Sequence, residues 1–230
     1  MKKTQSLAER AYNTIKRDIL TCVLDQGTLV AQSQMVEQYD FGITPVREAL
    51  KRLEAEGYVQ SSPRFGFVIT PITIKDVEDL YELRQVLETA SVRMAIQHAS
   101  NEQIAEFRRR VDFTYTFKDR ESYMEFLEGN IGFHVSIALM SGNRKLAEAL
   151  SRVLNEMTRI FNLGLDLRDS AEEMRNEHVA LVSALATRDI QRAEQIIQDQ
   201  IRRSRQRVVE MLISRQEKTN NTEISFNMQS

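Results

Sequence analysis

A short stretch from Thr44 to Gly57 has the spacing of an α-helix, with both ends marked by its residues. Thr44 can cap the first turn, and Pro45 suits the first helical position because its missing N–H would have no partner there. Gly57 can adopt the left-handed conformation that ends a helix. Apolar residues recur between these ends at intervals of three and four, which predicts one buried face made of Val46, Ala49, Leu50 and Leu53.

The opposite face of this helix is polar and carries Thr44, Arg47, Glu48 and Lys51. Arg47 falls in the first turn, where the helix dipole disfavours a cation by roughly 0.3 to 1 kcal/mol. An external anion would relieve this unfavourable placement, and a DNA phosphate is the natural candidate. We therefore expect this face to be exposed and to contact DNA.

The flanking residues predict a winged helix-turn-helix. Before the helix, Ser33 to Tyr39 has the pattern of a second short helix, and residues 40–43 form a tight connection that contains a glycine. After it, residues 58–68 read as a hairpin, and Leu29-Val30 is a short apolar segment that could pair with it. An earlier amphipathic stretch starts at the capping-box spacing Ser6 to Glu9 and supplies the first helix of this domain.

These residues together resemble the GntR family of bacterial transcription regulators. The resemblance rests on Thr44-Pro45-Val46-Arg47-Glu48-Ala49-Leu50, on the following Leu53, Glu54, Glu56 and Gly57, and on Arg64 to Val68. It implies that the second helix of the pair enters the major groove and that the hairpin reaches toward the minor groove. The DNA contacts implied are Thr44, Arg47, Lys51, Arg64 and Gly66. Family members commonly carry a Ser-Arg pair just before the Thr, where this chain has Gly42 and Ile43.

Overall charge does not by itself indicate a nucleic-acid partner. The pI is near 6.0, and residues 1–72 contain nine Lys and Arg against eight Asp and Glu. Groove binding needs a few well-placed cations rather than a high total charge. We therefore expect Glu37, Glu54 and Glu56 to lie away from the duplex.

The remainder of the chain is predicted to be helical, giving a mostly α protein with a small β-hairpin. The winged domain is expected over residues 1–70, a linker at 71–73 around Pro71, a helical domain at 74–215 and a disordered tail at 216–230. Helices are expected at 74–99, 101–118, 121–140, 144–163, 170–186 and 189–215. No run reaches the roughly 18 apolar residues of a membrane span, and Met1 is followed by no apolar signal core. We expect a cytoplasmic protein in which Cys22, the only cysteine, is a core residue.

Several polar residues fall on the apolar stripes of these helices. Asn130 and His134 share one stripe, His178 lies on another, and Gln200 and Arg84 lie on two more. An unpaired buried polar group costs about 1 to 3 kcal/mol. Polar residues from four helices that point to one interior therefore predict a polar cavity.

This half of the chain resembles the FCD effector-binding domain of the FadR subgroup. The matching residues are Leu83-Arg84 with Leu87-Glu88, Phe133-His134, Ser141-Gly142-Asn143, and Glu177-His178 with Leu181, Ala184, Leu185, Asp189 and Ala193. Many FCD domains hold a divalent metal with an Asp or Asn and three His, beside a pocket for a small carboxylate. The implied zinc or nickel ligands are Asn130, His134 and His178, and the fourth position is Gln200 where a His is expected. Arg84 and Gln200 are the implied effector contacts, with a structural salt bridge to a neighbouring helix as the alternative for Arg84. Because neutral amides are weak ligands, either the metal is held weakly or the effector binds directly.

The sequence thus predicts a homodimeric transcription repressor that binds a palindromic double-stranded DNA operator and responds to a small carboxylate effector. The sequence leaves two alternative functions open. A metal-dependent enzyme could use His134 and His178, although no Asp or Glu is placed beside them as an evident general base. A helical interaction scaffold would not depend on Arg47.

Overall fold

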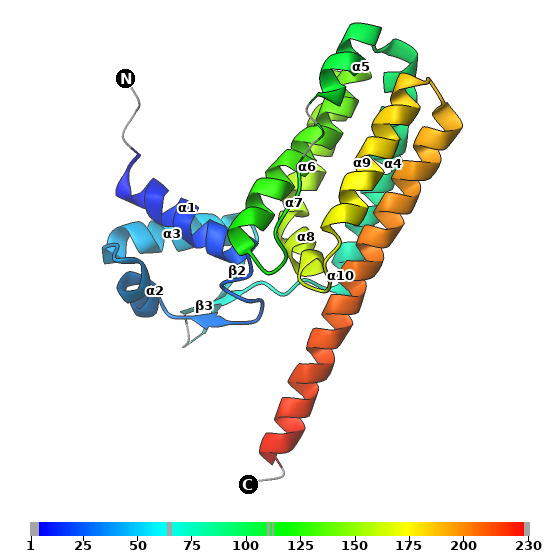
Figure 1. The fold of residues 1–230 in the computed structure, drawn as a ribbon. Helices are drawn as coiled ribbons and strands as arrows, with labels where there is room; N and C mark the ends of the chain where they lie inside the picture. The colour runs from blue at the N-terminus through cyan, green and yellow to red at the C-terminus, as the bar shows by residue number, and fades with distance from the viewer. Residues whose placement is uncertain (1–4, 64–65, 110, 112, 228–230) are drawn as a thin grey trace. The chain divides into compact units, whose positions relative to one another are not determined.

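The computed structural model describes residues 5–63, 66–109, 111 and 113–227, with side chains up to residue 215. Contacts within the chain separate it into two compact units, Met1–Ile72 and Thr73–Ser230 (Figure 1). Each unit has its own core and is described separately below.

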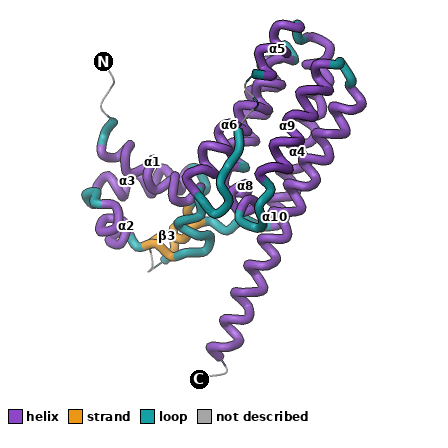
Figure 2. The backbone as a smooth tube through the Cα atoms, viewed as in Figure 1, coloured by secondary structure: helices purple, strands orange, loops and turns teal. Residues whose placement is uncertain are grey.

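The first unit is a three-helix domain with a small sheet, as predicted. Its helices are α1 (Leu7–Leu20), α2 (Gln32–Tyr39) and α3 (Ile43–Ala55). Its strands are β1 (Leu29–Val30), β2 (Val59–Ser62) and β3 (Gly66–Ile69), shown in orange in Figure 2. They form an antiparallel sheet in the order β1-β3-β2, with Leu29 opposite Val68 and Gln60 also opposite Val68. The hairpin and its pairing with residues 29–30 are therefore as expected from the sequence.

The core of this unit is formed by the apolar stripes of the three helices. Ser6 caps α1 by accepting from the backbone N–H of Glu9 at 3.1 Å, which is the predicted start. The predicted inner face of α3 is buried against α1 and the sheet, in a cluster that includes Ala11, Ile15, Ile19, Met35, Val46, Ala49, Leu50, Leu53, Val59 and Ile69. The burial of this stripe fixes which face of α3 points outward.

The two ends of α3 differ in how well the sequence predicted them. The N-cap is Gly42, without a side-chain cap, so Thr44 is the second helical residue and Pro45 the third. Pro45 is still tolerated there because the first four N–H groups of a helix have no intrahelical partner. The C-terminal end is as predicted: Gly57 has a φ of 80°, and the N–H of Tyr58 donates to the carbonyl of Leu53 at 2.9 Å.

The second unit is an all-helical bundle. Its helices are α4 (Ile74–His98), α5 (Asn101–Arg108), α6 (Arg120–Met140), α7 (Arg144–Glu156), α8 (Thr158–Leu165), α9 (Ala171–Ala186) and α10 (Ile190–Asn227). Helix α10 packs beside α4, α8 and α9, while α6 packs against α4 and α7 (Figure 1). Side-chain caps mark four starts, at Thr73, Ser100, Asp119 and Asn143.

Three predicted helices of this unit differ from the structure. Helix α5 stops at Arg108 instead of 118, because the rings of Phe113 and Tyr115 turn into the core against Phe126. The helix expected at 144–163 is broken at Met157 into α7 and α8. Helix α10 continues to Asn227, in place of the disordered segment expected from residue 216, and no Gly or Pro interrupts its sequence.

None of the helices in the described part of the chain combines the length and the apolar character that a membrane crossing requires.

Candidate functional sites

The N-terminal turn of α3 is held in place by α2. The side-chain amide of Gln32, the first residue of α2, donates to the carbonyl of Ile43 at 3.0 Å. The tight connection between the helices contains Asp40, whose φ of 52° is left-handed. Asp40 belongs to the small set of residue types that tolerate this conformation. The first exposed residues of α3 are therefore presented by a fixed backbone.

The outward face of α3 carries cations that form no ion pair with the side chains that the structure describes, and it also carries the exposed Glu48. Thr44, Arg47 and Lys51 are all exposed. Within the described residues, Arg47 and Lys51 form no ion pair. Arg52 on the same helix differs, because it pairs with Glu9 at 3.0 Å and with Glu56 at 3.2 Å. Two positive charges on this face thus remain available for an external anion.

Two acidic residues near the end of α3 are occupied by partners within the domain. Glu54 accepts from the backbone N–H of Ser61 on β2 at 3.0 Å. Glu56 accepts from Tyr12 and Lys16 of α1 at 2.8 and 2.7 Å. Burial alone would raise the pKa of Glu56, but these donors and Arg52 lower it below its usual value. Neither carboxylate is free to oppose the charge of Arg47 and Lys51.

The hairpin loop contributes one described residue of the predicted set. Gly66 begins β3 and is exposed, with a φ of 95°. A Cβ atom on this residue would lie 2.9 Å from the carbonyl oxygen of Val30. The packing of β3 against β1 therefore requires a glycine here, whatever the residue contacts outside the protein. Arg64, the other predicted contact in the hairpin, lies outside the described residues.

In the second unit the predicted polar residues are all buried, and they come from four helices. Arg84, Asn130, His134, His178 and Gln200 each expose 4% of their surface or less. The burial that their helical spacing predicted is thus confirmed, and their assignment to one site stays a prediction. The structure also shows which of them contact each other and which do not.

Arg84 forms a buried ion pair with Glu88, a residue for which the sequence predicted no role in a site. Its Nε donates to Oε1 of Glu88 at 2.5 Å, and Nδ1 of His134 lies 2.6 Å from Oε2 of the same carboxylate. Burial alone would raise the pKa of Glu88, but Arg84 and His134 lower it to about 2. The salt bridge of Arg84 is therefore within α4 and not with a neighbouring helix. Its i,i+4 spacing was visible in the sequence but is the same for exposed pairs.

His178 lies in an aromatic surrounding. Its ring centroid is 4.4 Å from that of Phe133, 4.9 Å from that of Phe113 and 5.8 Å from that of His134. Burial, and next the charge of His134, lower the pKa of His178 to about 3. The imidazole is therefore neutral near pH 7. Neither ring nitrogen has a hydrogen-bond partner among the described residues.

The buried amide oxygens Oδ1 of Asn130 and Oε1 of Gln200 also have no hydrogen-bond partner in the described structure. Both residues line a cavity of about 20 Å³ together with Arg84, Ser204 and Arg207. A space of this size holds about one water molecule. Ser204 is in turn hydrogen-bonded to Tyr81 at 2.7 Å. Orphan acceptors and buried guanidinium groups thus face the same small cavity.

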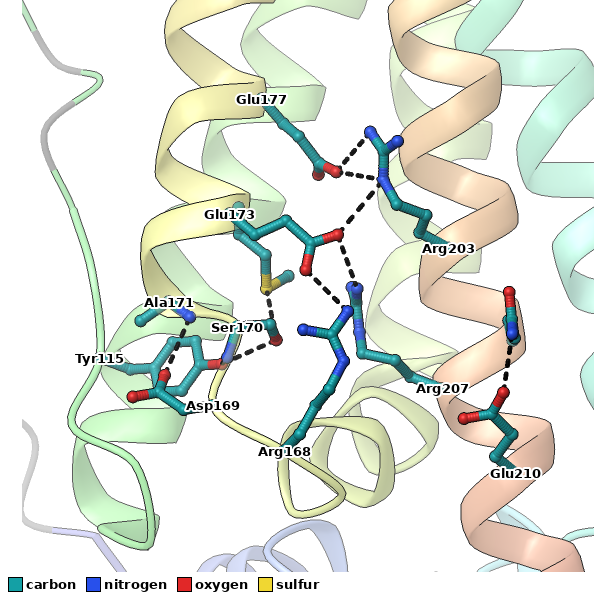
Figure 3. A network of polar contacts seen from close by, with 12 residues as sticks. Tyr115, Arg168, Asp169, Ser170, Ala171, Glu173, Glu177, Arg203, Arg207 and Glu210 are labelled. Atoms are coloured by element: carbon teal, nitrogen blue, oxygen red, sulfur yellow. Dashed lines mark hydrogen bonds and ion pairs between the residues drawn. The ribbon is translucent and has the colours of Figure 1, made fainter.

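A network of ion pairs joins α9 and α10 beside this cavity (Figure 3). Arg203 contacts Oε1 of Glu177 at 2.6 Å and Oε1 of Glu173 at 3.4 Å. Arg207 is buried but reaches Glu173 only at 3.8 Å, and its Nη1 has no hydrogen bond in the described part of the chain. Burial raises the pKa of Glu177 despite Arg203. Arg207 is therefore a buried cation with little compensation from neighbouring carboxylates.

The fit of this interior to a divalent metal is limited by its donors. The described residues contain no cluster of three or more His, Cys, Asp and Glu with metal-binding geometry. The candidate ligand atoms without a partner among the described residues are Nε2 of His134, both ring nitrogens of His178 and the amide oxygens of Asn130 and Gln200. The carboxylate of Glu88 on His134 is the support that ligating histidines usually have. The amides are weak ligands and no carboxylate of the described interior is left unpaired for the ion, so this donor set suits a weakly bound cation at most.

Comparison with known proteins follows the two units. Residues 7–69 match the family described as bacterial regulatory proteins, gntR family, and residues 79–203 match the FCD domain. The chain is 28% identical over 187 residues to the uncharacterized HTH-type transcriptional regulator YdhC of Bacillus subtilis (strain 168), covering 80% of this chain and 83% of that protein. It is 23% identical to the HTH-type transcriptional repressor RspR of Escherichia coli (strain K12), covering 81% and 82%. The solved structure of E. coli McbR/YncC has a TM-score of 0.61 at 20% identity, covering 92% of this chain and 99% of that one, and shows the similarity of fold.

Proposed function

The chain belongs to the gntR family of bacterial regulatory proteins and carries an FCD domain, and on this premise we propose that it is a DNA-binding transcription repressor controlled by a small effector. The observation that supports DNA binding most strongly is the exposed, unneutralised face of α3. Repression is supported by the name of one relative, a transcriptional repressor. Access to chromosomal DNA places such a protein in the cytoplasm.

In the proposed complex, α3 lies in the major groove. Thr44 and Arg47 are near its N-terminal end and Lys51 is one turn further along, so all three can reach the backbone or base edges. Arg47 is the fifth residue of α3 and so lies beyond the first turn, and its proposed contact with phosphate rests on the attraction between opposite charges. The hairpin, with Arg64 and Gly66, would lie toward the minor groove.

We also propose that the protein acts as a homodimer on a palindromic operator. One winged domain contacts only a short site, and a twofold dimer matches two half-sites of inverted sequence. Apolar side chains on the exterior of α4 support this assembly, because Leu83 and Val86 are exposed although both are aliphatic. A second copy of this chain is the partner that we assign to this surface.

The proposed effector is a small carboxylate bound beside Arg84 and Gln200. Arg207 adds a second buried guanidinium to the same cavity, and arginine is well suited to carboxylate recognition. The cavity of about 20 Å³ is too small for such a ligand, so binding requires its walls to move apart. A ligand that binds the opened state better shifts the population toward it, which is the requirement for control of operator affinity.

A divalent metal, zinc or nickel, is proposed as a weakly held component of this site. Asn130, His134 and His178 would supply its ligands, with Gln200 in the position where a histidine is expected. When bound, the metal would act as a Lewis acid for one carboxylate oxygen of the effector. Glu88 would keep the His134 ring oriented in either case.

The two alternatives are less well supported. The relatives are named as transcription regulators, which does not favour a metal-dependent enzyme that uses His134 and His178. A helical interaction scaffold gives no reason for the two unneutralised cations on α3.

A mobility-shift assay on the promoter region next to the gene that encodes this chain tests the proposal. Wild-type protein is expected to retard this DNA and Arg47→Ala to bind it much more weakly. Small carboxylic acids are expected to change the wild-type affinity and to raise its thermal stability. Equal binding of the promoter and of an unrelated duplex by both proteins would contradict the proposal.

A further inference from the structure

Ile43 is the first residue of α3, and its aliphatic side chain is 57% exposed. We propose that this side chain packs against the C5 methyl group of a thymine in the major groove and thereby selects that base in the operator. The inference rests on the DNA-binding function proposed above and names one of its specificity contacts.

Single exposed apolar residues are common on protein surfaces, so exposure alone does not carry the inference. Position does. Residues four apart on a helix lie on one face, and Ile43, Arg47 and Lys51 are spaced in this way. Charge complementarity between the two unneutralised cations and the phosphates would bring this row onto DNA. Ile43 stands at the N-terminal end of the row, which is the part of a recognition helix that contacts base edges.

The backbone of Ile43 is fixed before any ligand binds. Its carbonyl oxygen accepts the hydrogen bond from Gln32, and the preceding Gly42 has no side chain that could shield it. A β-branched side chain has few rotamers, so little conformational entropy is lost when it is placed against a base. The residue therefore behaves as a rigid apolar contact.

The partner follows from groove chemistry. Major-groove base edges present hydrogen-bond donors and acceptors, and the thymine C5 methyl is the apolar group among them. Ile43 has no side-chain donor or acceptor, so it can favour a base only through that methyl. An Arg side chain at the same position would instead pair with guanine.

The test begins with selection of binding sites from a random duplex library by the full chain. Each thymine of the selected site is then replaced singly by deoxyuridine, which removes only the methyl group. For wild-type protein, the replacement of one particular thymine per half-site is expected to lower the affinity for the duplex about fourfold, which is the value of one buried methyl group. For Ile43→Ala the same replacement should have almost no effect. Val23→Ala, which truncates a side chain 54% exposed in the turn after α1, should retain the wild-type response.

A second arm repeats the selection with Ile43→Arg, for which guanine is expected at the position where wild type selects thymine. Loss of affinity by Ile43→Ala with the same deoxyuridine response as wild type would overturn the thymine contact and leave DNA binding intact. Insensitivity of wild type to every deoxyuridine would do the same. Failure of the wild type to enrich any duplex would instead overturn the proposed function itself.

Discussion

Arg47 and Arg52 lie five residues apart on α3, and of the two only Arg52 forms ion pairs with described side chains. Arg52 fastens α3 to α1 through Glu9, while Arg47 stands on the opposite, unoccupied side of the helix. One cation therefore holds the domain together and the other is available to a partner. This difference between the two arginines supports the proposal that the outward face of α3 binds DNA.

The stability of the hairpin formed by β2 and β3 should depend on a glycine at position 66 for steric reasons. Gly66→Ala is expected to lower the free energy of unfolding by about 1–2 kcal/mol, because a left-handed backbone disfavours a Cβ atom. The new methyl would also press on the carbonyl oxygen of Val30. Thermal melting measures the effect. Gly132→Ala is the control, since no atom lies within 4 Å of the added methyl in the middle of α6, and it should raise stability slightly. A neutral result for Gly66→Ala would contradict the proposed strain.

The contact between α1 and α3 should weaken in acid. Glu56 has a lowered pKa in the folded protein, so it contributes stability that is present above its unfolded pKa of about 4.3. That contribution is lost as the pH falls through the folded pKa. The difference in melting temperature between wild type and Glu56→Gln should therefore shrink between about pH 5 and pH 3. A difference that stays constant over this range would show that Glu56 is not stabilised by Lys16 and Tyr12.

The buried pair on α4 should be far more sensitive to disruption than an exposed pair of the same spacing. Glu88→Gln leaves the buried Arg84 without its anion and is expected to cost about 3–5 kcal/mol of stability. Asp79→Asn removes the exposed partner of Lys75 on the same helix and should cost less than about 1 kcal/mol. Chemical denaturation compares the two. Similar small losses would mean that the Arg84 site is not desolvated in solution.

Metal affinity should be limited by the amide at position 200. Gln200→His replaces a weak amide ligand of the proposed metal site with an imidazole, and is expected to tighten zinc or nickel binding at least tenfold. Titration calorimetry with each metal, together with metal content of the purified protein, measures this. Ser204→His introduces an imidazole on the same wall of the cavity and serves as control. Unchanged affinity in Gln200→His would show that position 200 does not face the metal.

Much of the winged domain was predictable because its signals are local. The apolar stripe of α3 and the Gly57 stop depend on residues within one turn of each other, and both are found in the structure. The start of α3 was misplaced because Gly42 can act as N-cap without a side chain, whereas Thr44 suggested a cap by its chemistry.

The interior of the bundle was predictable only in part. Helical spacing placed His134 and His178 inward, as the structure does. The same spacing extended a helix to residue 118, although Phe113 and Tyr115 leave it to fill the core between distant helices. The role of Glu88 was missed because an i,i+4 pair looks the same whether it is buried or exposed. Long-range packing decides both outcomes, and it has no local signature.

The dependence of operator affinity on salt concentration tests the central claim most directly. Wild type, Arg47→Ala and Arg52→Ala are titrated on the same duplex over a range of salt concentrations. Log K falls as log salt rises. If Arg47 contacts a phosphate, Arg47→Ala makes this fall less steep, by about 0.9 in slope for each half-site, while Arg52→Ala keeps the wild-type slope. Identical slopes for wild type and Arg47→Ala would contradict the assignment of this face of α3 to DNA.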